Sequence, residues 1–198
     1  MADFEKMIPF ILHFAAGVKV SDLRKPIEQQ FEIAKKSGWS DDPDDPGGKT
    51  MIDVTLATYE QYCRRKGYPR PTALSLRNIP FAHWCEILKT MYWDKMQADK
   101  IASQGIANIC VDWLWASGTA RIKNIQRLLG VSPDGIVGPK TIAALNTQNA
   151  DVLFRRLYNA RTSFYKACKG YWKYGKGWMR RLDAINADGS FTIYGVKI

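Results

Sequence analysis

The stretch SGWSDDPDDPGGKTMIDVT, residues 37–55, is the most distinctive part of this sequence. Four of its aspartates fall within residues 41–45, although the whole chain has a formal net charge of +10. Its two prolines and its adjacent glycines at 47 and 48 oppose a helix or a regular strand. The stretch therefore predicts a rigid acidic loop, whose aspartates fix the turn by accepting hydrogen bonds from nearby backbone N–H groups.

The composition around this loop is that of a globular, mainly α protein. The 198 residues are 46% hydrophobic, 24% charged and 12% aromatic, which supplies one sizeable core and excludes a disordered chain. The apolar residues recur mostly with helical spacing. We expect helices at 3–16, 26–36, 55–67, 80–93, 104–117, 119–129 and 149–169, a short helix ending near 146, a loop at 68–79 and a short strand at 190–197.

The positive charge is concentrated towards the C-terminus. Residues 151–198 carry ten Lys and Arg against three acidic residues, so +7 of the +10 lies there. Such a surface suits a polyanion, namely nucleic acid, an anionic membrane or an anionic cell-wall polymer, and it equally suits a merely solvated face.

The sequence predicts neither a metal nor a cofactor. The four cysteines are scattered and the chain has only two histidines, so we expect free, buried thiols and no zinc site. In the acidic loop, Asp42, Asp44 and Asp53 fit the first, third and last positions of a calcium loop. Pro46, however, occupies the fifth position, where an oxygen ligand is needed.

The acidic loop resembles the signature of glycoside hydrolase family 108, a family of lysozyme-like N-acetylmuramidases. The family pattern is approximately E-G-G-Y-x-N-D-P-x-D-x-G-G-x-T-x-x-G-I-T. The residues that match it here are Asp42, Pro43, Asp45, Gly47, Gly48, Thr50 and Thr55. The resemblance implies that this loop forms the wall of a sugar-binding cleft.

Four further segments extend the resemblance over nearly the whole chain. Tyr92-Trp93 matches a YW pair, residues 112–118 (DWLWASG) are similar to D-x-x-x-N-S-G, and residues 175–181 (GKGWMRR) resemble G-x-G-W-x-x-R. Residues 125–145 look like the helical peptidoglycan-binding unit that ends these proteins.

The fold implied is mainly α, with two parts. A lysozyme-like helical domain is expected at residues 1–120, and a small C-terminal helical peptidoglycan-binding subdomain at residues 121–198.

The family's catalytic glutamate has no counterpart in this chain. Counted along the first helix, Ala15-Ala16-Gly17 stands in place of E-G-G, whereas counted back from the loop Lys36-Ser37-Gly38 does. An insertion of about twenty residues, 19–38, leaves both alignments open. Neither supplies the acid that must protonate the leaving oxygen of a glycosidic bond.

Two carboxylates are candidate substitutes for this acid. Glu32 lies one helical turn before Lys36, and Asp53 replaces a family glycine within the signature. Ala116 also replaces the asparagine of D-x-x-x-N-S-G.

The resemblance also suggests which residues bind the glycan. Of Trp113 and Trp115, which are about 200° apart around a helix, only one can face a cleft, and we expect Trp115. The aromatic residues near the C-terminus are expected either to stack on sugars or to close the core. The expected substrate-binding residues are Asp42, Asp45, Gly47, Gly48, Thr50, Trp93, Asp112, Trp115 and Trp178.

These observations predict a peptidoglycan-binding, lysozyme-like protein without muramidase activity, acting in cell-wall remodelling or secretion. One alternative is an active, endolysin-like muramidase with a relocated acid. A nucleic-acid-binding helical protein is disfavoured, because the motif in the basic tail already has a wall-binding explanation.

We also expect neither a secretory signal nor a membrane span, since Asp3 and Glu5 precede the short apolar segment 7–18. The resemblance implies synthesis in the cytoplasm, then action at the cell wall or periplasm after export through a holin or secretion component. The partner it implies is the glycan strands of peptidoglycan.

Overall fold

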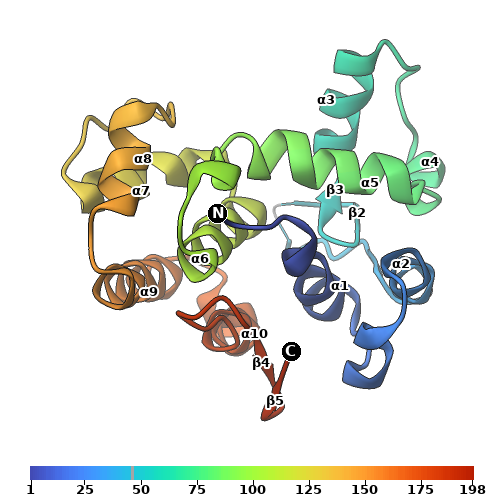
Figure 1. Ribbon diagram of the computed structural model, residues 1–198. Helices are drawn as coiled ribbons and strands as arrows, with labels where there is room; N and C mark the ends of the chain where they lie inside the picture. Colours follow the sequence, from blue (N-terminus) through green and yellow to red (C-terminus); the bar gives the residue numbers. More distant parts are fainter. Residues whose placement is uncertain (46) are drawn as a thin grey trace. The chain divides into compact units, whose positions relative to one another are not determined.

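The computed structural model describes residues 1–45 and 47–198, and Pro46, the fifth position of the calcium-loop pattern, lies outside them. The described chain is mainly helical (Figure 1), which confirms the expected fold class. Its α-helices are α1 Ile8–Ala16, α2 Ile27–Lys35, α3 Leu56–Lys66, α4 Ala73–Arg77, α5 Phe81–Leu88, α6 Gln104–Ser117, α7 Ile122–Leu129, α8 Pro139–Asn146, α9 Ala150–Lys166 and α10 Tyr171–Asp183. Its strands are β1 Trp39–Ser40, β2 Thr50–Met51, β3 Val54–Thr55, β4 Thr192–Ile193 and β5 Val196–Lys197.

Helices α3 and α9 begin where their capping residues predict. The Thr55 side chain accepts a hydrogen bond from the N–H of Thr58 at the start of α3, and Gly67 ends that helix with a φ of 71°. At the start of α9, the Asn149 side chain accepts from the N–H groups of the first helical turn. Because a capping oxygen satisfies N–H groups that lack a helical partner, these contacts confirm the expected starts of both helices.

The loop expected at 68–79 is wrong in part, because it contains the short helix α4. Thr72 and Ser75 form a reciprocal capping box at its start. This pairing satisfies two backbone donors at once and stabilises a helix of only five residues.

The single strand expected at 190–197 is instead a hairpin. Strands β4 and β5 pair antiparallel, with Ile193 opposite Val196. Tyr194 and Gly195, between the strands, have φ values of 48° and 78°. Two consecutive left-handed residues make the tight turn that best matches the twist of a hairpin.

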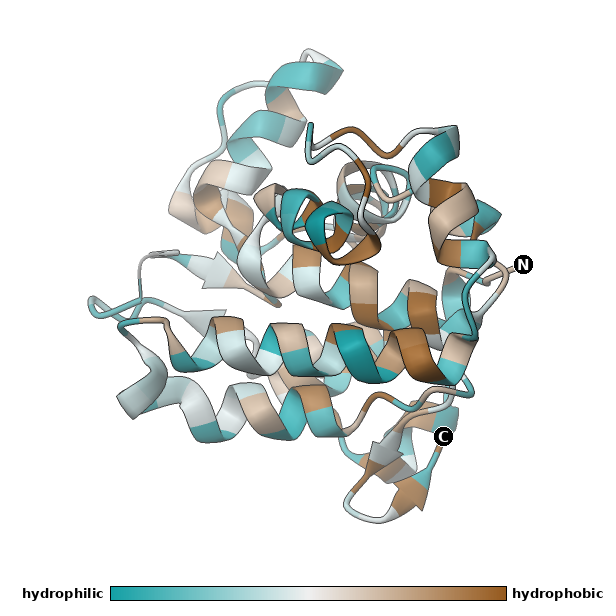
Figure 2. Ribbon diagram, turned by 90° about the vertical axis from the view of Figure 1, so that its left-hand side faces the viewer, coloured by the Kyte–Doolittle hydropathy of each residue, from teal (hydrophilic) through white to brown (hydrophobic). Residues whose placement is uncertain are grey.

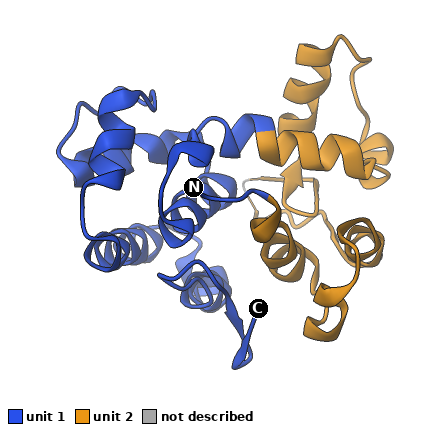
Figure 3. Cartoon of the chain, in the orientation of Figure 1, with its two compact units in different colours: residues 1–4, 90–198 blue, residues 5–89 orange. Residues whose placement is uncertain are grey.

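The chain divides into two compact units, coloured separately in Figure 3. One unit consists of residues 5–89, and the other of residues 1–4 with 90–198. The domain boundary expected at residue 120 stays a prediction.

In the unit 5–89, α1 packs against α2, and the antiparallel sheet has β2 between β1 and β3. In the other unit, α9 packs against both α6 and α10, and α7 packs against α8. Hydrophilic and hydrophobic residues alternate around the helices (Figure 2), as is typical of helices that bury one face.

The four cysteines are free thiols. Cys63 and Cys110 are buried, whereas Cys85 and Cys168 are half-buried. Burial raises the pKa of the Cys110 thiol to about 12. Within the described residues, we find no helix with the length and apolar character needed to cross a membrane.

Candidate functional site

The acidic loop joins β1 to β2 and is fixed by its own aspartates. Asp42 Oδ1 accepts a 3.0 Å hydrogen bond from the N–H of Asp44, and Asp45 Oδ1 accepts one of 2.8 Å from the N–H of Gly47. The Asp45 carbonyl accepts another from the N–H of Gly48 at 2.9 Å. These contacts are the turn-fixing bonds that the sequence indicates. Over residues 1–45 and 47–198, no group of three or more His, Cys, Asp or Glu side chains could hold a metal ion.

The hairpin that follows the loop turns through two residues in the left-handed region. Ile52 has a φ of 47° and Asp53 one of 62°, and they separate the paired residues Met51 and Val54. Left-handed backbone is rare for a β-branched residue, whereas aspartate tolerates it. Asp53 therefore fills, at modest conformational cost, a position where the family pattern has glycine.

The strained Ile52 is held by contacts on every side. Its N–H donates to the carbonyl of Gly38 at 2.8 Å, and its own carbonyl accepts from Trp84 Nε1 at 2.9 Å. Its side chain is completely buried, and a Cβ on Gly38 would lie only 2.5 Å from Ile52 Cγ1. Since strained backbone persists only where its surroundings determine it, these contacts fix the hairpin to Gly38 after α2 and to Trp84 on α5.

The C-terminal ends of α1 and α2 meet at the same place. Ser37 Oγ, just after α2, donates a 2.6 Å hydrogen bond to the carbonyl of Ala16 at the end of α1. A Cβ on Gly38 would lie 3.3 Å from Ala16 Cβ. Each of the two positions that the alignments allow for the family's glutamate directly precedes Ala16 or Ser37 in the chain. One holds the half-buried Ala15 and the other the exposed Lys36.

Glu32, the first candidate acid, lies on the exposed face of α2. Its side chain is 66% exposed, and its ion-pair partner Lys35 is 3.7 Å away. This setting lacks the apolar enclosure of a typical glycosidase acid. Around it is a shallow hollow of about 430 Å³ lined by Lys25, Glu28, Gln29, Glu32 and Ile33.

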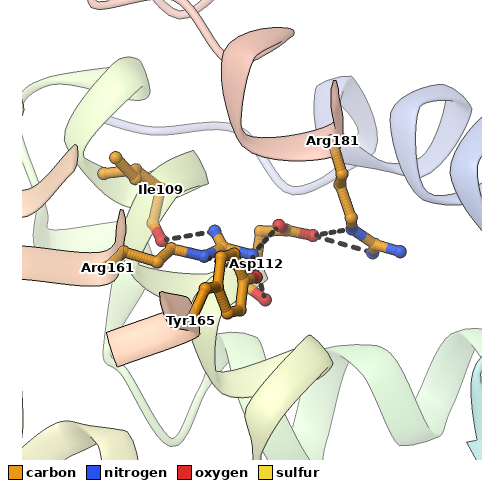
Figure 4. A network of polar contacts seen from close by, with 5 residues as sticks. All are labelled: Ile109, Asp112, Arg161, Tyr165 and Arg181. Atoms are coloured by element: carbon orange, nitrogen blue, oxygen red, sulfur yellow. Dashed lines mark hydrogen bonds and ion pairs between the residues drawn. The ribbon is translucent and has the colours of Figure 1, made fainter. Parts of the chain in front are cut away.

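Asp112 lies in a buried ion-pair network rather than on a surface (Figure 4). Its Oδ2 is 2.6 Å from an Nη of Arg161, and its Oδ1 is 2.8 Å from an Nη and 3.0 Å from the Nε of Arg181. Arg161 also donates from its Nε to the hydroxyl of Tyr165 at 2.8 Å. This pairing joins two segments that are far apart in the sequence, 112–118 and 175–181.

The two arginines determine the charge state of Asp112. Burial alone would raise the pKa of this carboxyl, but the charges of Arg181 and Arg161 outweigh burial and hold the pKa below its ordinary value. Asp112 is therefore ionised and ties together α6, α9 and α10. Both carboxylate oxygens are engaged within the protein.

The tryptophans expected at the substrate are largely enclosed. Trp93 is fully buried and donates from Nε1 to Asp99 Oδ1 at 2.6 Å. Trp115 is 6% exposed and packs edge-on against Tyr92. Trp178 is half-buried. The substrate-binding roles of the nine residues named from the sequence stay predictions.

In the C-terminal region, Gln126 organises the turn between α7 and α8. Its Nε2 donates to Asp134 Oδ1 at 2.8 Å and to the carbonyl of Ile136 at 3.0 Å, while its Oε1 accepts from the N–H of Gly135 at 2.8 Å. The turn SPDGIVGP is thus fixed by one buried amide. Ile136 is left 70% exposed at the outside of that turn.

Two known protein families match separate parts of the chain. Residues 30–118 match the family described as Glycosyl hydrolase 108, and residues 120–183 match the family described as Predicted Peptidoglycan domain. Residues 30–118 are thus similar to a glycosyl hydrolase 108 domain, and residues 120–183 to a C-terminal peptidoglycan domain.

Among solved structures, SagA of Brucella abortus is similar over 92% of this chain and 90% of its own, with a TM-score of 0.72 and 28% sequence identity. No curated protein matches the chain in sequence. The two family matches and this structural similarity give the chain a lysozyme-like, peptidoglycan-related role.

The glycosyl hydrolase 108 match begins at Gln30, within α2. It therefore includes Lys36 and the acidic loop, while Ala15 and the rest of α1 lie outside it.

Sequence reasoning missed Trp84 and Arg161. Trp84 fixes Ile52 from 32 residues away, and no local pattern marks such a contact. Arg161 was assigned to the basic surface with its neighbours, but it is completely buried. Its spacing of four from Tyr165, which places both on one face of α9, is the signal that could have found it.

Proposed function

We propose that this chain binds peptidoglycan glycan strands as a lysozyme-like protein whose muramidase activity is impaired. The observation that carries the proposal is the meeting of α1 and α2 through Ser37 and Ala16. The two positions where the family's glutamate could stand, Ala15 and Lys36, are the residues directly before Ala16 and Ser37, and they hold alanine and lysine.

Chemistry supports this proposal. Hydrolysis of a glycosidic bond needs an acid that protonates the leaving oxygen, and such proton transfer contributes about 10²–10⁴-fold to the rate. Alanine has no proton to give. An exposed lysine carries a positive charge at neutral pH and is a poor acid for an oxygen leaving group.

The rest of the fold is consistent with a retained binding surface. The turn of the acidic loop is fixed by Asp42 and Asp45, and the hairpin is clamped by Gly38 and Trp84. This geometry keeps the loop in one shape without requiring a catalytic acid. We accordingly propose that the loop binds N-acetyl and hydroxyl groups of the glycan.

The alternative function is an N-acetylmuramidase with a relocated acid. Glu32 fits this role poorly because its side chain is mostly exposed. Asp53 fits better, since it is half-buried within the signature hairpin.

The site of action belongs to the same proposal. A chain that binds peptidoglycan must reach the cell wall or periplasm. We propose export through a holin or secretion component, on the strength of the family resemblance alone.

The deciding experiment measures release of soluble muropeptides and new reducing ends from purified peptidoglycan, with an active muramidase as positive control. The same samples are centrifuged to measure binding of the protein to the insoluble material. We expect binding without release. Release with new reducing ends would overturn the proposed impairment, and absence of binding by the folded protein would overturn the proposed glycan contact.

A further inference from the structure

Helix α10 presents one exposed stripe that combines a tryptophan with cations. Trp172, Lys176 and Arg180 are all exposed and recur every four residues, so they lie along one side of the helix. Lys173, next to Trp172, is exposed as well. We call this set, together with Lys169 just before the helix, the α10 stripe.

Trp172 is unusual because the protein does not cover it. Its exposure is 83%, whereas Trp84, Trp93, Trp113 and Trp115 are each at most 6% exposed. The indole makes no hydrogen bond or ring contact within the described part of the chain. The opposite side of α10 is occupied by the buried residues Gly175, Arg181 and Leu182. The core therefore does not account for Trp172.

The charge around this tryptophan is of one sign. Residues 161–181 contain seven basic residues and no acidic one; Arg161 and Arg181 are buried with Asp112, which leaves five on the surface. Among the described residues, Lys169, Lys176 and Arg180 form no ion pair. Lys173 Nζ lies 5.0 Å from the centre of the Tyr174 ring. The stripe is thus a cationic surface suited to a polyanion.

The residue types around Trp172 favour a lipid surface over a polysaccharide. Residues 169–180 contain no Asp, Glu, Asn, Gln, Ser or Thr, the side chains that supply most acceptors for hydroxyl groups. Lysine and arginine beside an exposed indole instead match the headgroup region of a bilayer. There, cations meet lipid phosphates and tryptophan enters the boundary with the acyl chains.

We infer that the α10 stripe docks the protein on an anionic phospholipid surface, with Trp172 entering the interface and the lysines and Arg180 contacting lipid phosphates. This contact is separate from the glycan site of the proposed function. It would hold the protein beside the membrane while the acidic loop engages peptidoglycan.

The test uses the full chain and vesicles of phosphatidylcholine, with or without phosphatidylglycerol, in a co-sedimentation assay. We expect binding only to the vesicles that contain phosphatidylglycerol, and weaker binding as salt rises. Each cation near an anionic surface strengthens binding about fivefold, so the double variant K176A/R180A should bind about 30-fold more weakly. Trp172→Ala should weaken binding in addition.

Two variants control for net charge and for aromatic exposure. R64A/R65A removes the same charge from exposed positions on α3, and Tyr194→Ala removes another aromatic side chain, 79% exposed on the C-terminal hairpin. We expect both to bind as the parent protein does. All substituted side chains are exposed, and matching thermal unfolding confirms that the variants are folded.

Three results would overturn the inference. The first is absence of binding to phosphatidylglycerol vesicles. The second is equal weakening by the two double variants, which would mean that net charge alone acts. The third is binding of soluble poly(glycerol phosphate) that is equally sensitive to Trp172→Ala, which would assign the stripe to a wall polymer. Vesicle binding is measured without peptidoglycan, so a failure of the proposed glycan binding does not change its result. The proposed function and the membrane inference can therefore be refuted independently.

Discussion

Ser37 donates a hydrogen bond of 2.6 Å to the carbonyl of Ala16, and this contact joins the end of α2 to the end of α1. Ala15 and Lys36, the two candidate positions for the family's glutamate, are far apart in sequence, and each directly precedes one of these two bonded residues. The family match, residues 30–118, includes Lys36 and not Ala15, so we propose Lys36 as the first position to test. A carboxylate placed there is the sharpest test of the proposed impairment.

Lys36→Glu is expected to create or raise muramidase activity. A positioned acid contributes about 10²–10⁴-fold to such a reaction, so release of reducing ends should rise by at least about 10²-fold. Lys36→Gln, which removes the charge but supplies no acid, is the matched control and should leave release at the parent level. If folded Lys36→Glu binds peptidoglycan and still releases nothing, the missing acid is not the sole cause of impairment.

Asp53→Asn tests the relocated acid. Asparagine tolerates the left-handed φ of 62° at this position as aspartate does, so the variant should fold and bind peptidoglycan like the parent. Asp53→Gly should also fold, because glycine adopts this conformation without strain. Loss of muropeptide release in Asp53→Asn, with release retained in Glu32→Gln, would instead identify Asp53 as a working acid.

The local sequence was sufficient for most of the fold. Thr55 and Asn149 predicted helix starts that the capping bonds confirm, since a cap depends on residues within one turn. The same local reasoning overlooked the capping box of Thr72 and Ser75, which explains the missed helix α4. The three-stranded sheet was missed because each strand is only two residues long, too short for an alternating pattern.

The candidate site was predictable only where its chemistry is local. The aspartates of the acidic loop bond to backbone two residues away, so the sequence alone indicated their turn. Asp112 was read as a binding residue, but its partners Arg161 and Arg181 lie 49 and 69 residues later. No pattern within a short window reveals such contacts, and the strained Ile52 depends likewise on the distant Trp84.

Trp84→Phe should destabilise the protein by leaving the buried carbonyl of Ile52 without its donor. An unsatisfied buried acceptor costs about 1–3 kcal/mol. Trp93→Phe is the matched control, because Trp93 is equally buried. Its indole donates to the carboxylate of Asp99, which is an exposed residue, so water can replace the lost donor.

Urea unfolding of both variants measures the difference. We expect Trp84→Phe to lose about 1 kcal/mol or more beyond Trp93→Phe, and amide hydrogen exchange at Ile52 and Val54 to accelerate in Trp84→Phe alone. Equal losses and unchanged exchange at the hairpin would show that the indole contact does not clamp it.

Asp112→Asn should be strongly destabilising, because it leaves Arg161 and Arg181 without the carboxylate between them. Removing one partner of a buried ion pair costs about 3–5 kcal/mol. Asp151→Asn, an exposed substitution in the first turn of α9, should cost at most about 1 kcal/mol through the helix dipole.

The same carboxylate predicts how stability depends on pH. The pKa of Asp112 is lowered in the folded protein, so the unfolded chain binds this proton more readily. Its contribution to stability is complete above the ordinary aspartate pKa of about 3.9 and is lost as pH falls below that value towards the native pKa. Urea unfolding at a series of pH values from neutral to acidic should therefore show that the free energy of unfolding falls more steeply with decreasing pH in the parent than in Asp112→Asn. Parallel pH profiles would mean that Asp112 is not ionised in the native network.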